Sequence, residues 1–160
     1  MEANKKTVML PMEQLIGVVQ LQLSERGSAN LVVTGNSMWP LFGHMRDQVL
    51  LAPPSVYGKG DIVLYQRSNG QYVLHRILKK EKEVSICCGD NQCEKERIQN
   101  AWILAVVTDF YRKGKLYSVT SKGYRLYKWV WIRLFPVRRG ILLLARIGSR
   151  LKNKILGGKQ

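Results

Sequence analysis

The sequence predicts a mainly β domain with one helix before it and a basic helical tail after it. Three observations lead to this fold class. Seven short apolar runs are separated by turn residues. The pair Asn69-Gly70 stands between two of these runs, as a tight hairpin turn does. No acidic residue occurs after Asp109, so the composition of the C-terminal part differs from that of the rest. With 160 residues, 46% of them hydrophobic, the chain can bury a core of its own.

Residues 1–29 are predicted to form an amphipathic helix. Apolar residues recur at helical spacing, and Gly27 is a typical helix end. Polar side chains and Pro11 interrupt the apolar residues of 8–23. We therefore expect neither a cleavable signal peptide nor a membrane span here. The apolar stripe consists of Leu15, Ile16, Val19 and Leu23.

Residues 30–119 hold the predicted strands and form the expected β domain. The runs are short, rich in apolar and β-branched residues, and bounded by turn signals. This pattern is typical of a compact β-rich domain. The predicted strands are Leu31–Val33, Gln48–Ala52, Asp61–Gln66, Gln71–Leu78, Val84–Cys88, Trp102–Phe110 and Lys115–Val119.

Residues 120–160 form a basic, aromatic tail that is predicted to be helical. Pro136 is expected to separate two helical segments, the second over 137–155. Residues 1–109 contain 12 basic and 11 acidic residues, whereas 110–160 contain 14 basic and no acidic residues. This asymmetry excludes a uniformly basic nucleic-acid-binding protein. It describes a nearly neutral body with a strongly cationic end.

The tail pattern has two interpretations of equal weight. Trp129 and Trp131 among cations are typical of an interfacial helix on an anionic membrane surface. Packing of the apolar side on the β domain explains the same pattern. Four arginines within 129–147 argue against a transmembrane helix, since each costs about 2.5–3.5 kcal/mol at its centre. Nucleic acid is not an expected partner, because no helix-turn-helix pattern precedes the core. The other expected partner is a precursor protein or leader peptide.

The three cysteines indicate neither a disulfide framework nor a metal site. Their number is odd and two are adjacent, which favours a reducing compartment. A zinc site would need further ligands, and His44 and His75 lack the spacing of a zinc finger. We therefore expect no metal and no cofactor. The cysteines are Cys87, Cys88 and Cys93.

Three positions carry residues that suit acyl-transfer chemistry. Ser37 lies in a turn with glycine and proline, His75 lies on a hairpin strand, and Asp90 follows the next strand. Imidazole is the usual base for a serine hydroxyl near neutral pH. Each position alone is better explained structurally, as a turn residue or a core histidine. Their occurrence together and in this order favours a catalytic site.

Five motifs follow one another over roughly residues 30–110: Gly35-Asn36-Ser37-Met38-Trp39-Pro40, Asp47-Gln48-Val49, Lys59-Gly60-Asp61-Ile62-Val63, His75-Arg76-Ile77 and Gly89-Asp90-Asn91. In this order they resemble the signal peptidase I superfamily, which also contains the self-cleaving LexA-type repressors. The resemblance implies a core of coiled antiparallel β-sheets. It also implies a serine endopeptidase that removes signal or leader peptides from precursors.

The resemblance implies a role for each site residue. Ser37 occupies the position of the nucleophile and His75 that of the general base. Most bacterial signal peptidases use lysine as the base, and a His-Arg-Ile motif is similar to the endoplasmic-reticulum or SipW-like variant. The acid that orients His75 stays open between Asp90 and Glu96, and we favour Asp90. Because the base must be neutral, activity is expected to fall through the His75 pKa, near 6.5 if unperturbed.

Two departures from the family pattern shape the remaining expectations. Gly35 stands where signal peptidases often carry a serine, so backbone N–H groups are expected to form the oxyanion hole. Asn36 and Met38 are the candidates on this oxyanion or substrate side. The family's N-terminal membrane anchor is not recognisable in this sequence. We therefore expect a cytoplasmic enzyme, or one peripheral to the cytoplasmic membrane, that trims the leader of a dedicated peptide precursor. The alternative is a non-catalytic binding or regulatory protein with a peptidase-like fold, peripheral to the membrane.

Overall fold

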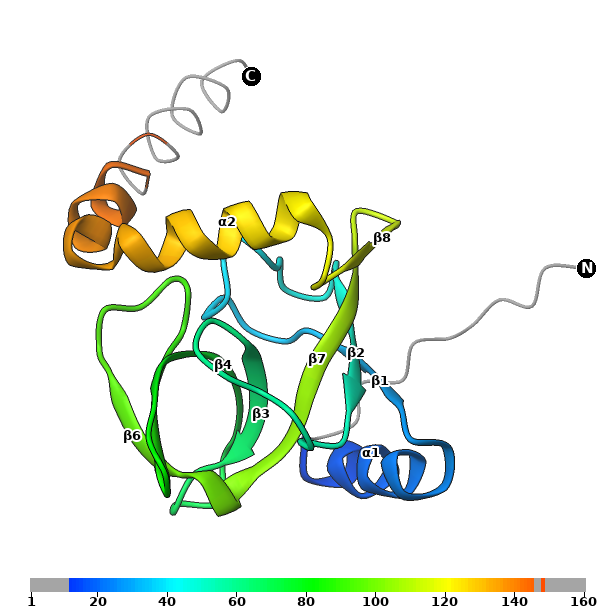
Figure 1. Ribbon diagram of the computed structural model, residues 1–160. Helices are drawn as coiled ribbons and strands as arrows, with labels where there is room; N and C mark the ends of the chain where they lie inside the picture. Colours follow the sequence, from blue (N-terminus) through cyan, green and yellow to red (C-terminus); the bar gives the residue numbers. More distant parts are fainter. Residues whose placement is uncertain (1–11, 146–147, 149–160) are drawn as a thin grey trace, which may run out of the picture.

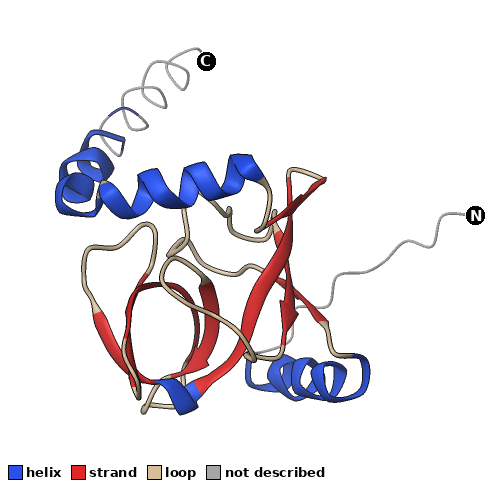
Figure 2. Ribbon diagram, viewed as in Figure 1, coloured by secondary structure: helices blue, strands red, loops and turns tan. Residues whose placement is uncertain are grey.

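Eight antiparallel strands form the sheet on which the helices pack (Figures 1 and 2). The fold comes from a computed structural model, which describes residues 12–145 and 148. The strand order is β1-β2-β7-β3-β4-β5-β6, and β8 pairs with the end of β7. The elements are α1 (Met12–Arg26), β1 (Ala29–Val32), β2 (Gln48–Ala52), β3 (Ile62–Gln66), β4 (Tyr72–Lys80), β5 (Val84–Cys88), β6 (Glu96–Gln99), η1 (Asn100–Trp102), β7 (Ile103–Arg112), β8 (Lys115–Ser118), α2 (Lys122–Arg133) and η2 (Phe135–Val137).

The predicted mainly β architecture is confirmed, and so are all seven predicted strands. The Asn69-Gly70 hairpin joins β3 to β4, which pair from Gln66 opposite Tyr72 onward. One strand of the structure, β6, was not predicted from the sequence. Ile98 is its only apolar residue and its only buried one, so the segment has no recognisable apolar run.

Strand β7 is the longest and joins the two halves of the sheet. It pairs with β2 on one edge and, on the other edge, with β3 near its start and with β8 near its end. Register shifts between Leu50 and Leu51, and between Leu64 and Tyr65, mark irregularities of the kind that increase twist. In Figure 1, β3, β4 and β6 curl around on one side of β7, while β1 and β2 lie on its other side.

Two apolar clusters fill the fold. The larger one combines Ile16 of α1, Phe110 of β7 and Tyr124 of α2 with residues of β1 to β3. The smaller one lies among β3 to β7 and includes Tyr65 and Ile77. All three predicted segments, 1–29, 30–119 and 120–160, therefore contribute to the larger cluster.

The N-terminal helix ends as its sequence predicts. Ile16, Val19 and Leu23 are buried. The N–H of Gly27 donates to the carbonyl of Leu23 at 3.1 Å, with Gly27 at a φ of +68°. Glycine is favoured in this left-handed conformation, which commonly ends a helix. Residues 1–11 of the predicted segment lie outside the described residues.

The tail begins with α2, which lies across one end of the sheet (Figure 2). The Ser121 hydroxyl accepts from the N–H of Tyr124 and caps the helix. Tyr124 and Trp131 are buried, so the packing interpretation holds for this face. A break at η2, which contains Pro136, separates α2 from a second helix over 138–145, as predicted. The rest of the second predicted segment, 146–147 and 149–155, lies outside the described residues.

Candidate active site

Ser37 lies in the turn that follows β1, and buried neighbours hold this turn in place. Met38 is 1% exposed and forms part of the core. Its carbonyl accepts from Phe42 at 3.0 Å, and the Asn36 carbonyl accepts from Trp39 at 3.2 Å. Ser37 itself is half-buried. The core residue Met38 thus anchors a tight turn that leaves the preceding serine at the surface.

His75 lies in the interior on β4, and its partners fix one ring nitrogen. The side chain is 1% exposed. The Tyr65 hydroxyl donates to Glu96 Oε2 at 2.8 Å and lies 3.2 Å from His75 Nδ1. The Tyr65 hydroxyl has a single proton, which it donates in the hydrogen bond to Glu96. His75 Nδ1 must therefore carry a proton and donate it to the Tyr65 oxygen. This places the free lone pair of the imidazole on Nε2.

The other ring nitrogen, Nε2, faces the Ser37 turn across Gly89. A Cβ at Gly89 would lie 3.1 Å from His75 Nε2 and 2.6 Å from the Ser37 carbonyl oxygen. Asn91 ties the two turns together, since its N–H donates to that same carbonyl at 2.8 Å and its side chain to the Asn36 carbonyl at 3.1 Å. The structure therefore places the Ser37 backbone and His75 Nε2 on either side of Gly89.

The described residues show no hydrogen bond between the Ser37 hydroxyl and His75. Catalytic hydrogen bonds in free enzymes are often long and tighten when substrate binds. The glycine at position 89 leaves no side chain between the Ser37 turn and the imidazole, so the two can lie close together.

For the acyl-transfer reaction that the sequence leads us to expect, replacement of Gly89 by alanine should lower kcat/KM by about 10- to 100-fold, because a small displacement of reacting groups has such effects. The new methyl group would meet the Ser37 carbonyl and push it from His75. Gly58→Ala is the matched control, since its Cβ would meet nothing within 4 Å. Equal rates for both variants would contradict this geometry.

The acid that lies beside His75 is Glu96, whereas Asp90, the favoured candidate, pairs with another residue. Glu96 Oε1 lies 3.5 Å from His75 Nδ1. Asp90 instead forms a fully buried bidentate pair with Arg76, at 2.8 and 2.6 Å. Asp90 also accepts a hydrogen bond from Tyr127 of α2 at 3.4 Å. In the structure, Asp90 therefore compensates the buried charge of Arg76 and attaches α2 to the sheet through Tyr127.

Burial keeps the His75 imidazole neutral. Burial lowers the pKa of His75 to about 4, although the Glu96 carboxylate favours the imidazolium form. Burial also opposes the ionisation of Glu96, but hydrogen bonds from Arg67 and Tyr65 outweigh it, and the pKa of Glu96 lies below its ordinary value. Burial and the hydrogen bond to Glu96 raise the pKa of Tyr65, which stays protonated. The site therefore holds a neutral base next to a fixed carboxylate.

Backbone donors are available for an oxyanion next to Ser37. Within the described residues, the N–H groups of Ser37 and Met38 donate to no protein acceptor. Such free N–H groups are the usual components of an oxyanion hole. The Asn36 side chain is exposed, and the Met38 side chain is in the core. Met38 therefore suits this role through its backbone and not through its side chain.

A small cavity of ≈80 Å³ opens beside Ser37. Residues at the end of β1 and the start of β4 form its walls, together with Leu64 of β3. Its lining is mostly apolar, and its size suits one small side chain. The lining residues are Leu31, Val32, Val33, Thr34, Ser37, Met38, Leu64, Tyr72, Val73 and Leu74. Trp39, at 41% exposure, lies outside this lining.

The cysteines are free thiols. Burial raises the pKa of Cys87 to about 12 and that of Cys88 to about 11, so neither suits nucleophilic chemistry. Cys93 is exposed. Over residues 12–145 and 148, no three His, Cys, Asp or Glu side chains gather as a metal would require.

Three residues of the site escaped prediction from the sequence: Tyr65, Arg67 and Gly89. Arg67 donates to both carboxylate oxygens of Glu96, one of them at 2.8 Å, and so holds that acid in place. The glycine stands in the Gly89-Asp90-Asn91 motif, but its contacts depend on the tertiary fold. Neither the tyrosine nor the arginine belongs to a recognisable motif.

Comparison of the chain with protein-family models and with curated proteins finds no match. The part of the chain that the structure describes contains no helix with the length and apolarity needed to cross a membrane.

Proposed function

We propose that this protein is a serine endopeptidase of the signal peptidase type, which cleaves signal or leader peptides from precursors. The observation that carries the proposal is the orientation of His75. Its Nδ1 is held by Tyr65 beside Glu96, and its unprotonated Nε2 faces the Ser37 turn across Gly89. The five ordered motifs and the curled antiparallel sheet support a peptidase core of the same type.

The proposed reaction is acyl transfer through Ser37. As Ser37 Oγ bonds to the scissile carbonyl carbon, its proton moves to His75 Nε2. The N–H groups of Ser37 and Met38 stabilise the oxyanion. When the C–N bond breaks, His75 returns the proton to the leaving amine. Water then attacks the acyl-enzyme with His75 as base, which releases the new carboxyl end and restores Ser37.

Tyr65 and Glu96 assist this reaction through His75. When Nε2 takes the proton, the imidazole becomes a cation in a buried position. The nearby Glu96 carboxylate compensates that charge, and Arg67 prevents the carboxylate from turning away. Tyr65 holds the Nδ1 proton and therefore the tautomer. Tyr65 and Glu96 are positioning residues in this mechanism.

The surroundings of Ser37 suggest how a peptide is held. Strand β1 pairs only with β2 among the described strands, so its other edge offers backbone groups. An extended peptide along that edge would add a strand to the sheet. The ≈80 Å³ cavity would then receive a small apolar side chain next to the scissile bond. We expect leaders with small residues before the cleavage point to be the best substrates.

Cleavage of a panel of secretory and peptide-precursor leaders, in detergent or lipid, tests the proposal. The full chain is compared with Ser37→Ala, and a serine-directed acylating inhibitor provides a second measurement. We expect one class of leader to be cut and the inhibitor to label Ser37, with both results lost in Ser37→Ala. Cleavage that survives Ser37→Ala would refute the mechanism. Absence of both cleavage and labelling would favour the non-catalytic alternative.

The acid limb of the pH profile is expected near pH 4, well below the ordinary histidine range. The base acts when neutral, so activity is present above its pKa and is lost as pH falls through it. Since burial lowers the His75 pKa to about 4, activity should persist through pH 6.5. Glu96→Gln removes a charge that favours the imidazolium, so the limb should move to still lower pH. The measurement is kcat/KM as a function of pH. An acid limb near pH 6.5 would contradict the expectation that burial lowers the His75 pKa.

A further inference from the structure

The outward face of α2 combines large exposed apolar side chains with cations. Leu126 is 63% exposed and Trp129 is 57% exposed, although both belong to a helix whose opposite side is buried. Leu126, Trp129, Val130 and Arg133 recur at spacings of three and four residues and so share one side of the helix. We call this side, defined by Arg125, Leu126, Trp129, Val130 and Arg133, the outer face of α2.

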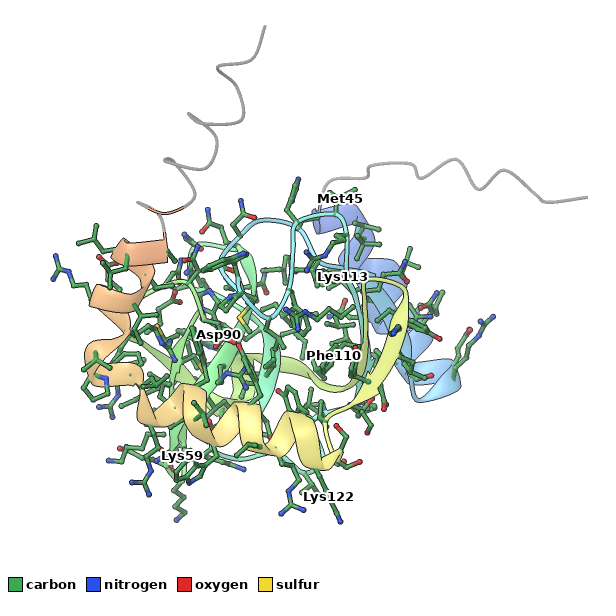
Figure 3. All side chains as sticks on the ribbon, turned by 90° about the horizontal axis from the view of Figure 1, so that it is seen from above. Met45, Lys59, Asp90, Phe110, Lys113 and Lys122 are labelled. Carbon is green, nitrogen blue, oxygen red and sulfur yellow. The ribbon has the colours of Figure 1, made fainter. Side chains whose placement is uncertain are left out.

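Cations gather in a hollow beside this face. The hollow measures ≈440 Å³ and is lined by Lys59, Arg125, Lys128, Trp129, Ile132 and Arg133. Asp61 neutralises Lys128 at 3.1 Å, whereas the other three cations have no acidic partner in the described part of the chain. The Arg133 guanidinium lies 5.2 Å from the centre of the Trp129 ring. In Figure 3, Lys59 and Lys122 lie along one edge of α2 and Asp90 lies on its other side.

The charge and the apolar content together indicate one kind of occupant. No acidic residue occurs after Asp109, so nothing in the helical tail repels an anionic surface. Arginine and lysine attract lipid phosphates, tryptophan prefers the headgroup level, and exposed leucines enter the acyl boundary. A second apolar pair, Leu143 and Leu144, is 58% and 70% exposed on the helix that follows. Exposed leucines beside cations favour a lipid surface over a single-stranded nucleic acid, whose bases stack on aromatic rings.

We propose that the outer face of α2, with Lys59, docks the protein on the headgroups of an anionic lipid bilayer. The buried side of the same helix stays on the sheet through Tyr124 and Trp131. Packing on the β domain and membrane binding are therefore properties of two sides of one helix. The docking does not depend on the proposed peptidase activity.

Docking has a structural consequence for the candidate active site. Arg138, which is buried at the start of the second tail helix, donates to the Gly89 carbonyl at 3.2 Å and to the Trp131 carbonyl at 3.1 Å. Gly89 is the residue that separates Ser37 from His75. The same short segment thus connects the lipid-binding helix to the catalytic turn. If the proposed function holds, the serine is fixed relative to a membrane on which leader peptides would be presented.

Co-sedimentation of the full chain with vesicles tests the docking. Vesicles of phosphatidylcholine alone are compared with vesicles that also contain phosphatidylglycerol. The test variant is Lys59→Gln/Arg125→Gln/Arg133→Gln, and the control is Arg26→Gln/Lys82→Gln/Arg97→Gln, which removes the same charge from exposed positions elsewhere. Each cation near an anionic surface raises the binding affinity about five-fold. The test variant, which loses three cations, should therefore bind roughly 100-fold more weakly.

Further measurements separate docking through this face from a general effect of net charge and from binding to other polyanions. Trp129→Ser should weaken binding at high salt, where the electrostatic part is screened. Equal losses in the test and control variants would mean that only net charge matters, and they would overturn the proposal. Undiminished binding by the test variant would overturn it too. So would tighter binding to a nucleic acid or a polyglutamate peptide than to the anionic vesicles.

Discussion

Replacement of Ser37 by alanine should abolish leader cleavage, with a loss in kcat/KM of about 10⁴-fold or more. The removed hydroxyl is the nucleophile of the proposed mechanism, and no other group replaces it. The residue is half-buried, and its side chain makes no hydrogen bond with the described residues, so Tm should stay nearly constant. Ser55→Ala, at an exposed turn serine, is the control and should keep full activity.

His75→Gln should cause a loss of similar size, and the double variant should lose little more than either single variant. Residues that act in one step are strongly non-additive, because the second replacement removes a group that has already lost its partner. Glutamine retains much of the side-chain volume in this buried position, so the fold is preserved for the comparison. Single-variant losses that multiply in the double variant would contradict joint action of Ser37 and His75.

The sequence was sufficient for most of the fold because the strands differ from the turns in composition. Each predicted strand has two or more buried apolar residues or a tight turn at its end. The Asn69-Gly70 hairpin forms readily because Gly70 can adopt the left-handed conformation of the turn, with a φ of +84°. Strand β6 has neither signal, since Ile98 alone is buried. Its position depends on pairing with β5, where Glu96 lies opposite Cys87.

The alternation of side chains along β4 explains why Glu96, and not Asp90, lies beside His75. Adjacent residues of a strand point to opposite faces of the sheet, so His75 and Arg76 of β4 do so too. Arg76 meets Asp90 on its face, near α2. His75 faces the other way, toward the start of β6. Asp90 is nearer to His75 in the sequence, but the alternation of β4 places it with the neighbouring arginine.

Tyr65 illustrates a second kind of information that the sequence lacks. It joins His75 because β3 and β4 pair with Val63 opposite His75 and Tyr65 opposite Val73. Residues two apart on a strand share a face, and diagonal neighbours across two strands lie within reach of an aromatic side chain. A shift of one residue would move the hydroxyl to the other face. The register must therefore be known before the tyrosine can be assigned to the site.

Asp90→Asn should destabilise the fold by about 3–5 kcal/mol, as expected when one member of a buried ion pair is removed. For a chain of this size, that loss lowers Tm by roughly 10 °C or more. Arg76 is fully buried and would keep its charge beside a neutral amide. Glu96→Gln is the matched comparison, because Glu96 is a partly exposed acid. It should change Tm much less and lower kcat instead.

A double-mutant cycle measures whether this loss comes from the pair. In Arg76→Met/Asp90→Asn the buried cation is gone together with its partner, so the double variant should be more stable than the sum of the two single losses predicts. Arg76 also donates to the Gly60 carbonyl at 2.8 Å and to the Tyr124 hydroxyl at 3.1 Å, so recovery should be partial. Thermal unfolding and leader cleavage are measured on the same preparations. If Asp90→Asn kept its Tm and lost cleavage while Glu96→Gln kept both, Asp90 would be the catalytic acid after all. The opposite pattern assigns Asp90 to the attachment of α2 and Glu96 to His75.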